Sequence, residues 1–150
     1  PISYTGLRPG ELAQIKTADV DLENRYMRGG LKTLAGKNRV IPVALKILPL
    51  IKQLYNPDAE YLVISPLDNK PVLTYARLVS HFWKNSPALK SLPTKHLPHD
   101  GRHTCATLMD NAEVPLKIRQ LILGHSSQDI TSRVYTHKTI PQLIDTIDLI

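Results

Sequence analysis

Six side chains in this sequence have the chemistry needed to act together on one phosphodiester. Arginine forks clamp the non-bridging oxygens of a phosphate, lysine and histidine transfer protons, and a tyrosine hydroxyl can attack phosphorus. Two arginines, two histidines, a lysine and a late tyrosine fit neither an ordinary core nor a metal site. The six residues are Arg8, Lys32, His99, Arg102, His125 and Tyr135.

The two arginines can supply the positive charge that many nucleases take from metal ions. A guanidinium offers a planar fork for two phosphate oxygens and stays positive at any relevant pH. Glu11 follows Arg8 by one helical turn, so an i,i+3 contact can orient that guanidinium. The sequence offers no carboxylate cluster for metals, so we expect no metal and no cofactor. Loss of Arg8 or Arg102 is expected to silence the chemistry while the domain stays folded.

The other candidates are expected to gather around the same phosphate. His99 and Arg102 are three residues apart at a helix start, so both can face one side. His125 follows Gly124, which allows a left-handed helix cap that turns His125 toward the site, where it would donate to a non-bridging oxygen. Tyr135 is the expected nucleophile, because a phenol needs a base or a strongly cationic site to ionise.

A zinc site is the alternative interpretation of part of this region. The four potential ligands fit no compact structural-zinc spacing, and they would place Arg102 beside the metal. The sequence therefore favours the phosphate site. The four residues are His96, His99, His103 and Cys105.

Five short motifs, in their order and intervals, resemble those of the tyrosine recombinase (phage integrase) family. Each motif alone is weak evidence, whereas the set spans roughly residues 3–138 and is strong evidence. One departure is Gly101, where the family usually has a large apolar residue, and glycine is expected to loosen the helix start. The motifs are TGLRPGEL at 5–12, KT at 32–33 before RVIPV at 39–43, HDGRHT at 99–104, LILGHS at 121–126 and VYTH at 134–137.

The resemblance implies cleavage and rejoining of double-stranded DNA in site-specific recombination. Tyr135 would form a 3′-phosphotyrosyl link, and Lys32, with Lys37 as a rival, would protonate the leaving 5′-oxygen. His99 would accept the proton of the tyrosine or donate to the phosphate. In the family, four protomers act together on DNA, and the segment after the tyrosine often docks on a neighbouring protomer.

Three alternatives to a recombinase remain open. A type IB topoisomerase would use the same residues and would relax supercoils as a monomer. A catalytically inactive DNA-binding module would have lost the chemistry, although none of the six residues is substituted. A structural or partner-binding domain would not need Arg8, Lys32, Arg102 and Tyr135 together.

Bulk properties agree with one domain over residues 1–150 that acts on a polyanion. The chain is 42% hydrophobic and has a formal net charge of +6, which suits DNA but does not identify it. The single cysteine, Cys105, excludes an internal disulfide and fits a reducing cytoplasm, and the resemblance implies a bacterial or phage-encoded protein. The start at Pro1 is expected for part of a longer protein, with the DNA-clamping domain of the family absent here.

The predicted fold is α+β and mainly α-helical, with a small antiparallel sheet near the N-terminus. A short helix should begin near Pro9 and run through Ile15. Residues 24–43 are predicted to be sheet, with turns at Gly29-Gly30 and at 35–38. A loop over 56–71 should contain a short strand at 61–64, and 86–98 should be largely irregular.

The predicted helices carry apolar residues at helical spacing. The helix over 45–55 should direct Leu45, Leu48 and Ile51 to one side, and a helix capped by Thr74 should direct Leu78, Val79, Phe82 and Trp83 inward. Three further helices are expected over 99–111, 115–123 and 127–136. Residues 139–150 predict a final helix with one apolar stripe, packed on its own core or docked in trans: Ile140, Leu143, Ile144, Ile147 and Ile150.

Overall fold

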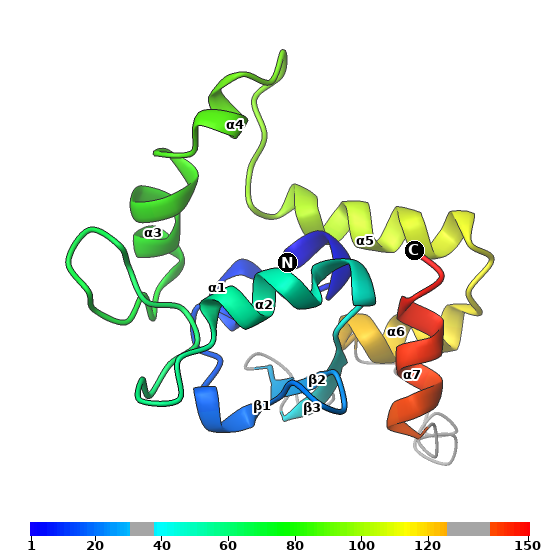
Figure 1. The fold of residues 1–150 in the computed structure, drawn as a ribbon. Coiled ribbons are helices and arrows are strands. Elements are labelled where there is room, and N and C mark those ends of the chain that lie inside the picture. Colours follow the sequence, from blue (N-terminus) through cyan, green and yellow to red (C-terminus); the bar gives the residue numbers. More distant parts are fainter. Residues whose placement is uncertain (31–37, 126–138) are drawn as a thin grey trace.

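Short helices lie above and to one side of a three-stranded antiparallel sheet in the view of Figure 1. The computed structural model describes residues 1–30, 38–125 and 139–150. Lys32, Lys37, Tyr135 and the helix predicted over 127–136 lie outside these ranges. In chain order the elements are η1 (Ile2–Tyr4), α1 (Pro9–Leu12), η2 (Thr17–Asp19), β1 (Val20–Asp21), β2 (Tyr26–Gly29), β3 (Arg39–Pro42), η3 (Leu45–Ile47), α2 (Leu48–Leu54), α3 (Tyr75–Leu78), η4 (Val79–Trp83), α4 (Pro87–Lys90), α5 (Asp100–Asn111), α6 (Leu116–Leu123) and α7 (Ile140–Ile147).

The sheet has the order β1-β2-β3, with Met27 of β2 paired with Val20 and with Ile41. The predicted sheet is confirmed for β2 and β3, and β1 was not predicted because it is only two residues long. The turn predicted at Gly29 is wrong. Gly29 ends β2 opposite Arg39, and a Cβ there would lie 2.4 Å from Cδ1 of Ile15.

The first helix is shorter than predicted. It begins at Pro9 as expected but ends at Leu12, because the next residues turn away to pair with a distant segment. The carbonyl of Ile15 accepts from Leu62 N at 2.9 Å, and Thr17 N donates to the carbonyl of Glu60 at 3.0 Å. The strand predicted at 61–64 is therefore reduced to isolated bridges on either side of this segment.

The helix predicted over 45–55 is divided into η3 and α2. Pro49 lies in the first turn of α2, where its missing N–H is tolerated. The prediction that Leu45 shares the inward side of this helix is wrong, since Leu45 is 62% exposed, whereas Ile47 and Ile51 are buried. The tight 3-10 turn before α2 shifts the buried side from Leu45 to Ile47.

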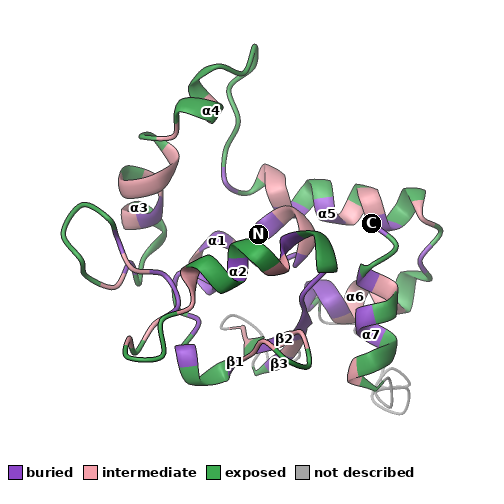
Figure 2. Ribbon diagram, in the orientation of Figure 1, coloured by how far each residue is buried: buried purple, intermediate pink, exposed green. Residues whose placement is uncertain are grey.

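An arm built from α3, η4 and α4 stands off the body (Figure 1), and Figure 2 shows that its residues are mainly exposed or intermediate. Thr74 caps α3 as predicted, accepting from Arg77 N at 3.2 Å. Leu78 is buried, whereas Trp83 is only half-buried, and its Nε1 donates to the carbonyl of His96 at 2.9 Å. Residues 86–98 are mostly irregular, as predicted, apart from the single turn of α4, which Ser86 caps.

Helix α5 packs against η1 at the position where glycine was expected to loosen it. A Cβ on Gly101 would lie 3.1 Å from Cγ2 of Ile2 and 3.2 Å from Oγ of Ser3. The space that a larger side chain would need is already filled by η1. The glycine therefore permits a close contact between α5 and η1, although it still weakens the helix intrinsically.

The last helix, α7, packs on its own chain in this structure. Thr139 and Gln142 form a capping box, and Leu143, Ile144, Ile147 and Ile150 are buried as the apolar stripe predicts. Beyond the helix, Asp148 accepts both guanidinium arms of Arg25, at 3.1 and 2.8 Å, and the N–H of Leu45 at 2.8 Å. Of the described helices, none is long and apolar enough to cross a membrane.

Candidate active site

Arg8 lies at the start of α1, where Glu11 holds both its backbone and its side chain. The Glu11 carboxylate accepts Arg8 N at 2.9 Å and Arg8 Nη1 at 3.1 Å. The structure thus has the i,i+3 contact expected from the sequence. Glu11 is only 3% exposed, while the Arg8 side chain is 24% exposed. The guanidinium is therefore fixed on one side and open to an incoming anion on the other.

Arg39 is a buried partner of Glu11 that the sequence prediction missed. Its Nη1 and Nη2 donate to the two oxygens of Glu11 at 3.3 and 3.1 Å, and its Nε donates to the carbonyl of Ile122 at 3.2 Å. The signal was present as an arginine beginning an apolar strand. The partner, 28 residues away, could not be derived from local spacing.

Arg102 links the segments that carry Arg8 and His125. Its Nη1 donates to the carbonyl of Gly6 and its Nη2 donates to the carbonyl of Leu123 at 2.6 Å. Burial, followed by the nearby charges of Arg8 and Arg39, lowers the pKa of Arg102 to about 10. The guanidinium is still positive at neutral pH. Two of its five N–H groups donate to these carbonyls.

His125 stands at the C-terminal end of α6, beside the same arginines. Gly124 adopts the predicted left-handed cap, at φ 65° and ψ 42°, and His125 N donates to the carbonyl of Gln120 at 3.0 Å. Partial burial and then the charges of Arg102, Arg8 and Arg39 lower the pKa of His125. The imidazole is therefore neutral at pH 7 and offers one N–H to an acceptor.

The structure brings Arg8, Arg102 and His125 together but gives His99 different surroundings. His99 is exposed immediately before α5, and its ring meets the ring of Tyr75 edge-on at 6.4 Å between centroids. Lys32 and Tyr135 lie outside the described residues. Within the described ranges, no group of three His, Cys, Asp or Glu side chains is placed to hold a metal ion.

The cluster has an excess of positive charge. Three guanidiniums act electrostatically on His125, and Glu11 is the carboxylate that faces them. Such a group attracts an anion and excludes a divalent metal unless further carboxylates are added. The arrangement can clamp the oxygens of one phosphate between side chains of α1, α5 and the end of α6.

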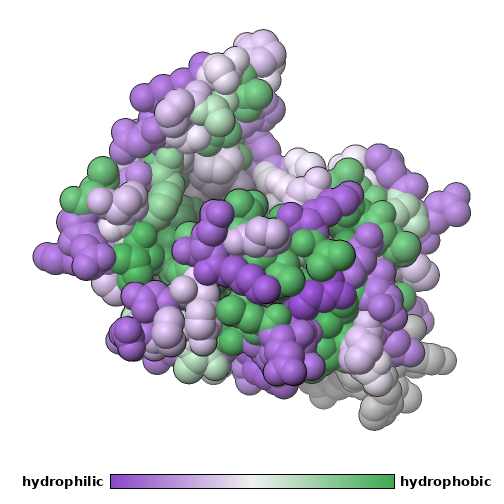
Figure 3. Space-filling view, viewed as in Figure 1, coloured by the Kyte–Doolittle hydropathy of each residue, from purple (hydrophilic) through white to green (hydrophobic). Residues whose placement is uncertain are grey.

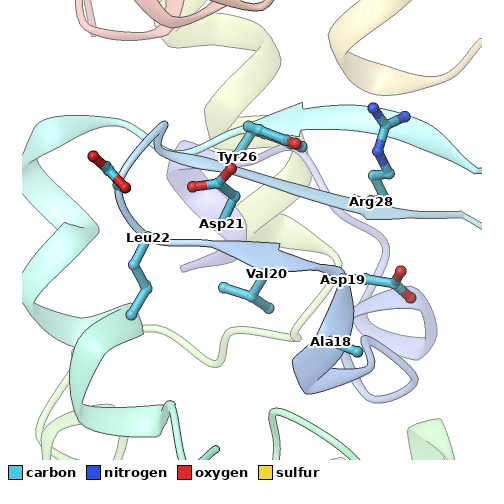
Figure 4. Close-up of a pocket in the computed structure, with 8 residues that line it drawn as sticks. Ala18, Asp19, Val20, Asp21, Leu22, Tyr26 and Arg28 are labelled. Carbon is cyan, nitrogen blue, oxygen red and sulfur yellow. The ribbon is translucent and has the colours of Figure 1, made fainter.

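A separate pocket of about 370 Å³ lies along β1 and β2 (Figure 4). Its lining includes Asp19, Asp21 and Glu23, and Figure 4 shows Asp21 beside Tyr26. None of the predicted site residues lines it. Three carboxylates would repel a phosphate, so this pocket is not the anion site.

Acid should destabilise this site through Glu11. Burial raises the pKa of Glu11, but hydrogen bonds from Arg39 and Arg8 outweigh it and leave the pKa below its ordinary value of 4.5. Below pH 4.5 the unfolded chain binds this proton first, so the free energy of unfolding falls as pH falls through the folded pKa. Glu11→Gln should remove this part of the acid sensitivity. Urea unfolding between about pH 7 and about pH 3.5 measures the difference.

Glu60→Gln is the matched control, because Glu60 is an exposed glutamate in a surface pair with Lys16. The control should retain the acid sensitivity of the unchanged protein. Equal pH dependence in the protein and in Glu11→Gln would show that the buried pair does not stabilise the fold.

Known proteins are similar to this chain in sequence and in fold. The model of the phage integrase family matches residues 2–140. Tyrosine recombinase XerA of Pyrococcus furiosus is 31% identical over 96% of this chain and 50% of the relative. Tyrosine recombinase XerC of Staphylococcus saprophyticus is 32% identical over 93% of this chain and 47% of the relative. The chain thus spans about half the length of the curated relatives that it matches.

Solved structures agree with these matches. The crystal structure of XerA recombinase superposes with a TM-score of 0.63 at 27% identity, over 96% of this chain and 53% of that chain. The Tn1549 transposon integrase in complex with transposon right end DNA gives 0.61 at 26% identity, over 94% and 54%. The predicted α+β, mainly helical fold is confirmed. Because the family model matches residues 2–140, this chain belongs to the phage integrase family.

Proposed function

We propose that this chain is the catalytic domain of a site-specific DNA recombinase or integrase, with Tyr135 as nucleophile. The observation that carries the proposal is that Arg8, Arg102 and His125 come from three distant segments and lie close enough for their charges to interact, while Arg102 bonds the carbonyls of Gly6 and Leu123. The similar XerA recombinase and the DNA-bound Tn1549 integrase support the same reading.

The proposed reaction is a transesterification at one phosphodiester. Arg8 and Arg102 neutralise the non-bridging oxygens, and neutral His125 donates its N–H to one of them. The Tyr135 oxygen bonds to phosphorus while the bond from phosphorus to the 5′-oxygen breaks. His99 accepts the phenolic proton or donates to the phosphate, and Lys32 protonates the departing 5′-oxygen. A 5′-hydroxyl from a partner strand reverses the step, and the phosphotyrosyl link conserves the bond energy, so ATP is not needed.

The charge distribution supports a DNA duplex as substrate. We call residues 69–98 the basic arm. It contains five of the 19 Lys and Arg residues and none of the 13 Asp and Glu residues, so it carries most of the net charge of +6. Figure 3 shows hydrophilic residues over much of this projection. A long exposed segment of one charge sign fits a phosphate backbone. The cationic members are Lys70, Arg77, Lys84, Lys90 and Lys95.

Neutralising the basic arm should weaken DNA binding and its salt dependence. In the triple variant Lys84→Gln, Lys90→Gln, Lys95→Gln, each lost phosphate contact should reduce the slope of log affinity against log salt by about 0.9. The full effect is a reduction of about 2.7. Fluorescence anisotropy with a labelled duplex at several salt concentrations measures it.

The matched control replaces three lysines outside the arm, Lys16, Lys46 and Lys52, with glutamine. It lowers the net charge equally but should reduce the slope far less. If both triple variants had equal slopes, only net charge would matter, and the arm would not be the DNA contact.

We also propose that four protomers assemble on two DNA sites, and that residues 139–150 can dock in trans. The support is the apolar stripe of α7, which packs on β3 of its own chain here and would meet the identical surface of a neighbour if the segment were exchanged. Sedimentation of the protein on a four-way DNA junction counts the protomers. A single protomer per junction at saturation would contradict the assembly.

Strand exchange tests the proposed function against topoisomerase activity. Two duplexes with the cognate site and different labels are incubated with the protein, and a supercoiled plasmid is incubated in parallel. A recombinase produces duplexes that carry one label from each parent. Relaxed plasmid without any exchanged product would overturn recombination in favour of a type IB topoisomerase.

A further inference from the structure

Arg39 connects three elements of the site from a buried position. It begins β3, its guanidinium contacts both oxygens of Glu11 in α1, and its Nε contacts the carbonyl of Ile122 near the end of α6. Its side chain is only 6% exposed. A side chain so enclosed can order the site without touching a substrate.

The end of α6 is shaped around this arginine. A Cβ on Gly124 would lie 2.9 Å from Cδ of Arg39 and 3.0 Å from Cζ. Gly124 therefore has two roles. It adopts the left-handed cap, and its lack of a side chain leaves room for Arg39 directly beside the backbone that leads into His125. A displacement of Arg39 would be transmitted directly to the backbone that carries His125.

Glu11 gives Arg39 a second route to the site. A carboxylate has about four lone-pair positions and can hold an arginine bidentately. Arg39 occupies both oxygens, so Arg8 uses a single Nη1 contact there and keeps its remaining donors. Without Arg39, the buried carboxylate would have Arg8 as its remaining guanidinium partner, and a bidentate pair would withdraw Arg8 from the anion site.

We propose that Arg39 is a positioning residue for DNA cleavage. By its hydrogen bonds to Glu11 and to the carbonyl of Ile122, it holds the side chains of Arg8 and His125 in the positions that they need around the scissile phosphate. The inference rests on the proposed function and adds Arg39 to the six proposed catalytic residues as a residue that acts through others. Arg39 itself does not contact the DNA.

The test compares Arg39→Met with Arg119→Met in single-turnover cleavage of a saturating nicked DNA substrate. Arg119 is the matched control, since it lies in the first half of α6 and pairs with a different carboxylate, that of Asp110. Arg39→Met should slow cleavage by about 10- to 100-fold with DNA affinity unchanged, because only the placement of donors to the transition state is altered. Arg119→Met should cleave like the unchanged protein.

Two further variants keep the proposal falsifiable if Arg39→Met folds poorly. Arg39→Lys keeps the charge but cannot reach Glu11 and Ile122 together, so it should fold and cleave at an intermediate rate. The double variant Glu11→Gln, Arg39→Met should be less impaired than the product of the two single effects, because both act through one carboxylate. Folded Arg39 variants that cleave at the full rate, or that lose affinity and rate in parallel, would overturn the proposal.

A titration of His125 by NMR separates this inference from the proposed function. Removal of the Arg39 charge should raise the pKa of His125 and shift its ring signals, whereas Arg119→Met should leave both unchanged; His125→Gln identifies the signal. If the unchanged protein forms no DNA adduct, the proposed function fails. Independently of that result, a His125 titration in Arg39→Met identical to that in the unchanged protein would overturn the positioning role.

Discussion

Replacing Arg102 with methionine is expected to abolish DNA cleavage and also to lower the free energy of unfolding by about 2–4 kcal/mol. The side chain is 7% exposed, and it satisfies the buried carbonyls of Gly6 and Leu123. Methionine fills similar space but leaves both acceptors unpaired. Urea unfolding measures the stability, and single-turnover formation of a covalent DNA adduct measures the chemistry.

Arg8→Gln is the comparison that separates chemistry from folding. Arg8 is partly exposed and its side chain bonds Glu11, which also keeps Arg39. The change should slow cleavage by about 10²–10³-fold, which is the usual effect of losing one donor to the transition state. The free energy of unfolding should stay within about 1 kcal/mol of that of the unchanged protein. Equal destabilisation by the two changes would contradict the linking role assigned to Arg102.

The sequence predicted those parts of the site that depend on local geometry. The i,i+3 contact of Arg8 with Glu11 follows from one helical turn, and the cap at Gly124 follows from the freedom of glycine at positive φ. Both of these helix ends depend on only a few adjacent residues, so local sequence is enough to predict them. The fold class was predictable because the motif order and the apolar periodicity agree.

Long-range partners were not predictable from spacing. Glu11 meets Arg39 and Arg102 meets two backbone carbonyls only because β3, α5 and α6 converge, and no local pattern encodes that convergence. The contacts of Arg102 therefore revise the expectation that its loss would leave the fold unharmed, whereas for Arg8 that expectation stays a prediction. The inward position predicted for Leu45 failed for a similar reason, since a tight turn before α2 changed the helical phase.

The environment of His99 was also decided by tertiary structure. A spacing of three from Arg102 placed both on one side of an ideal helix. In the structure α5 begins after His99, so the ring meets Tyr75 of α3 instead of sharing the buried face of Arg102. Its role as proton acceptor or phosphate donor is a proposal that a His99→Gln variant addresses, alongside Lys32→Ala for the leaving group.

Tyr135→Phe has the largest expected effect on chemistry alone. The change removes one oxygen atom, the proposed nucleophile, and should lower formation of the covalent adduct by about 10⁴-fold or more, as loss of a covalent nucleophile does in other enzymes. DNA affinity should not change, because the basic arm and the arginines remain. Tyr55→Phe is the matched control, a half-buried tyrosine of the body.

The most direct measurement is the covalent adduct on a nicked suicide substrate, resolved on a denaturing gel with EDTA present. The complete protein and Tyr55→Phe should form the adduct, Tyr135→Phe should not, and EDTA should have no effect. The DNA released on the other side of the break should carry a 5′-hydroxyl that a kinase can label. An adduct that persists in Tyr135→Phe, or no adduct from unchanged protein that binds the DNA, would contradict metal-free catalysis by Tyr135.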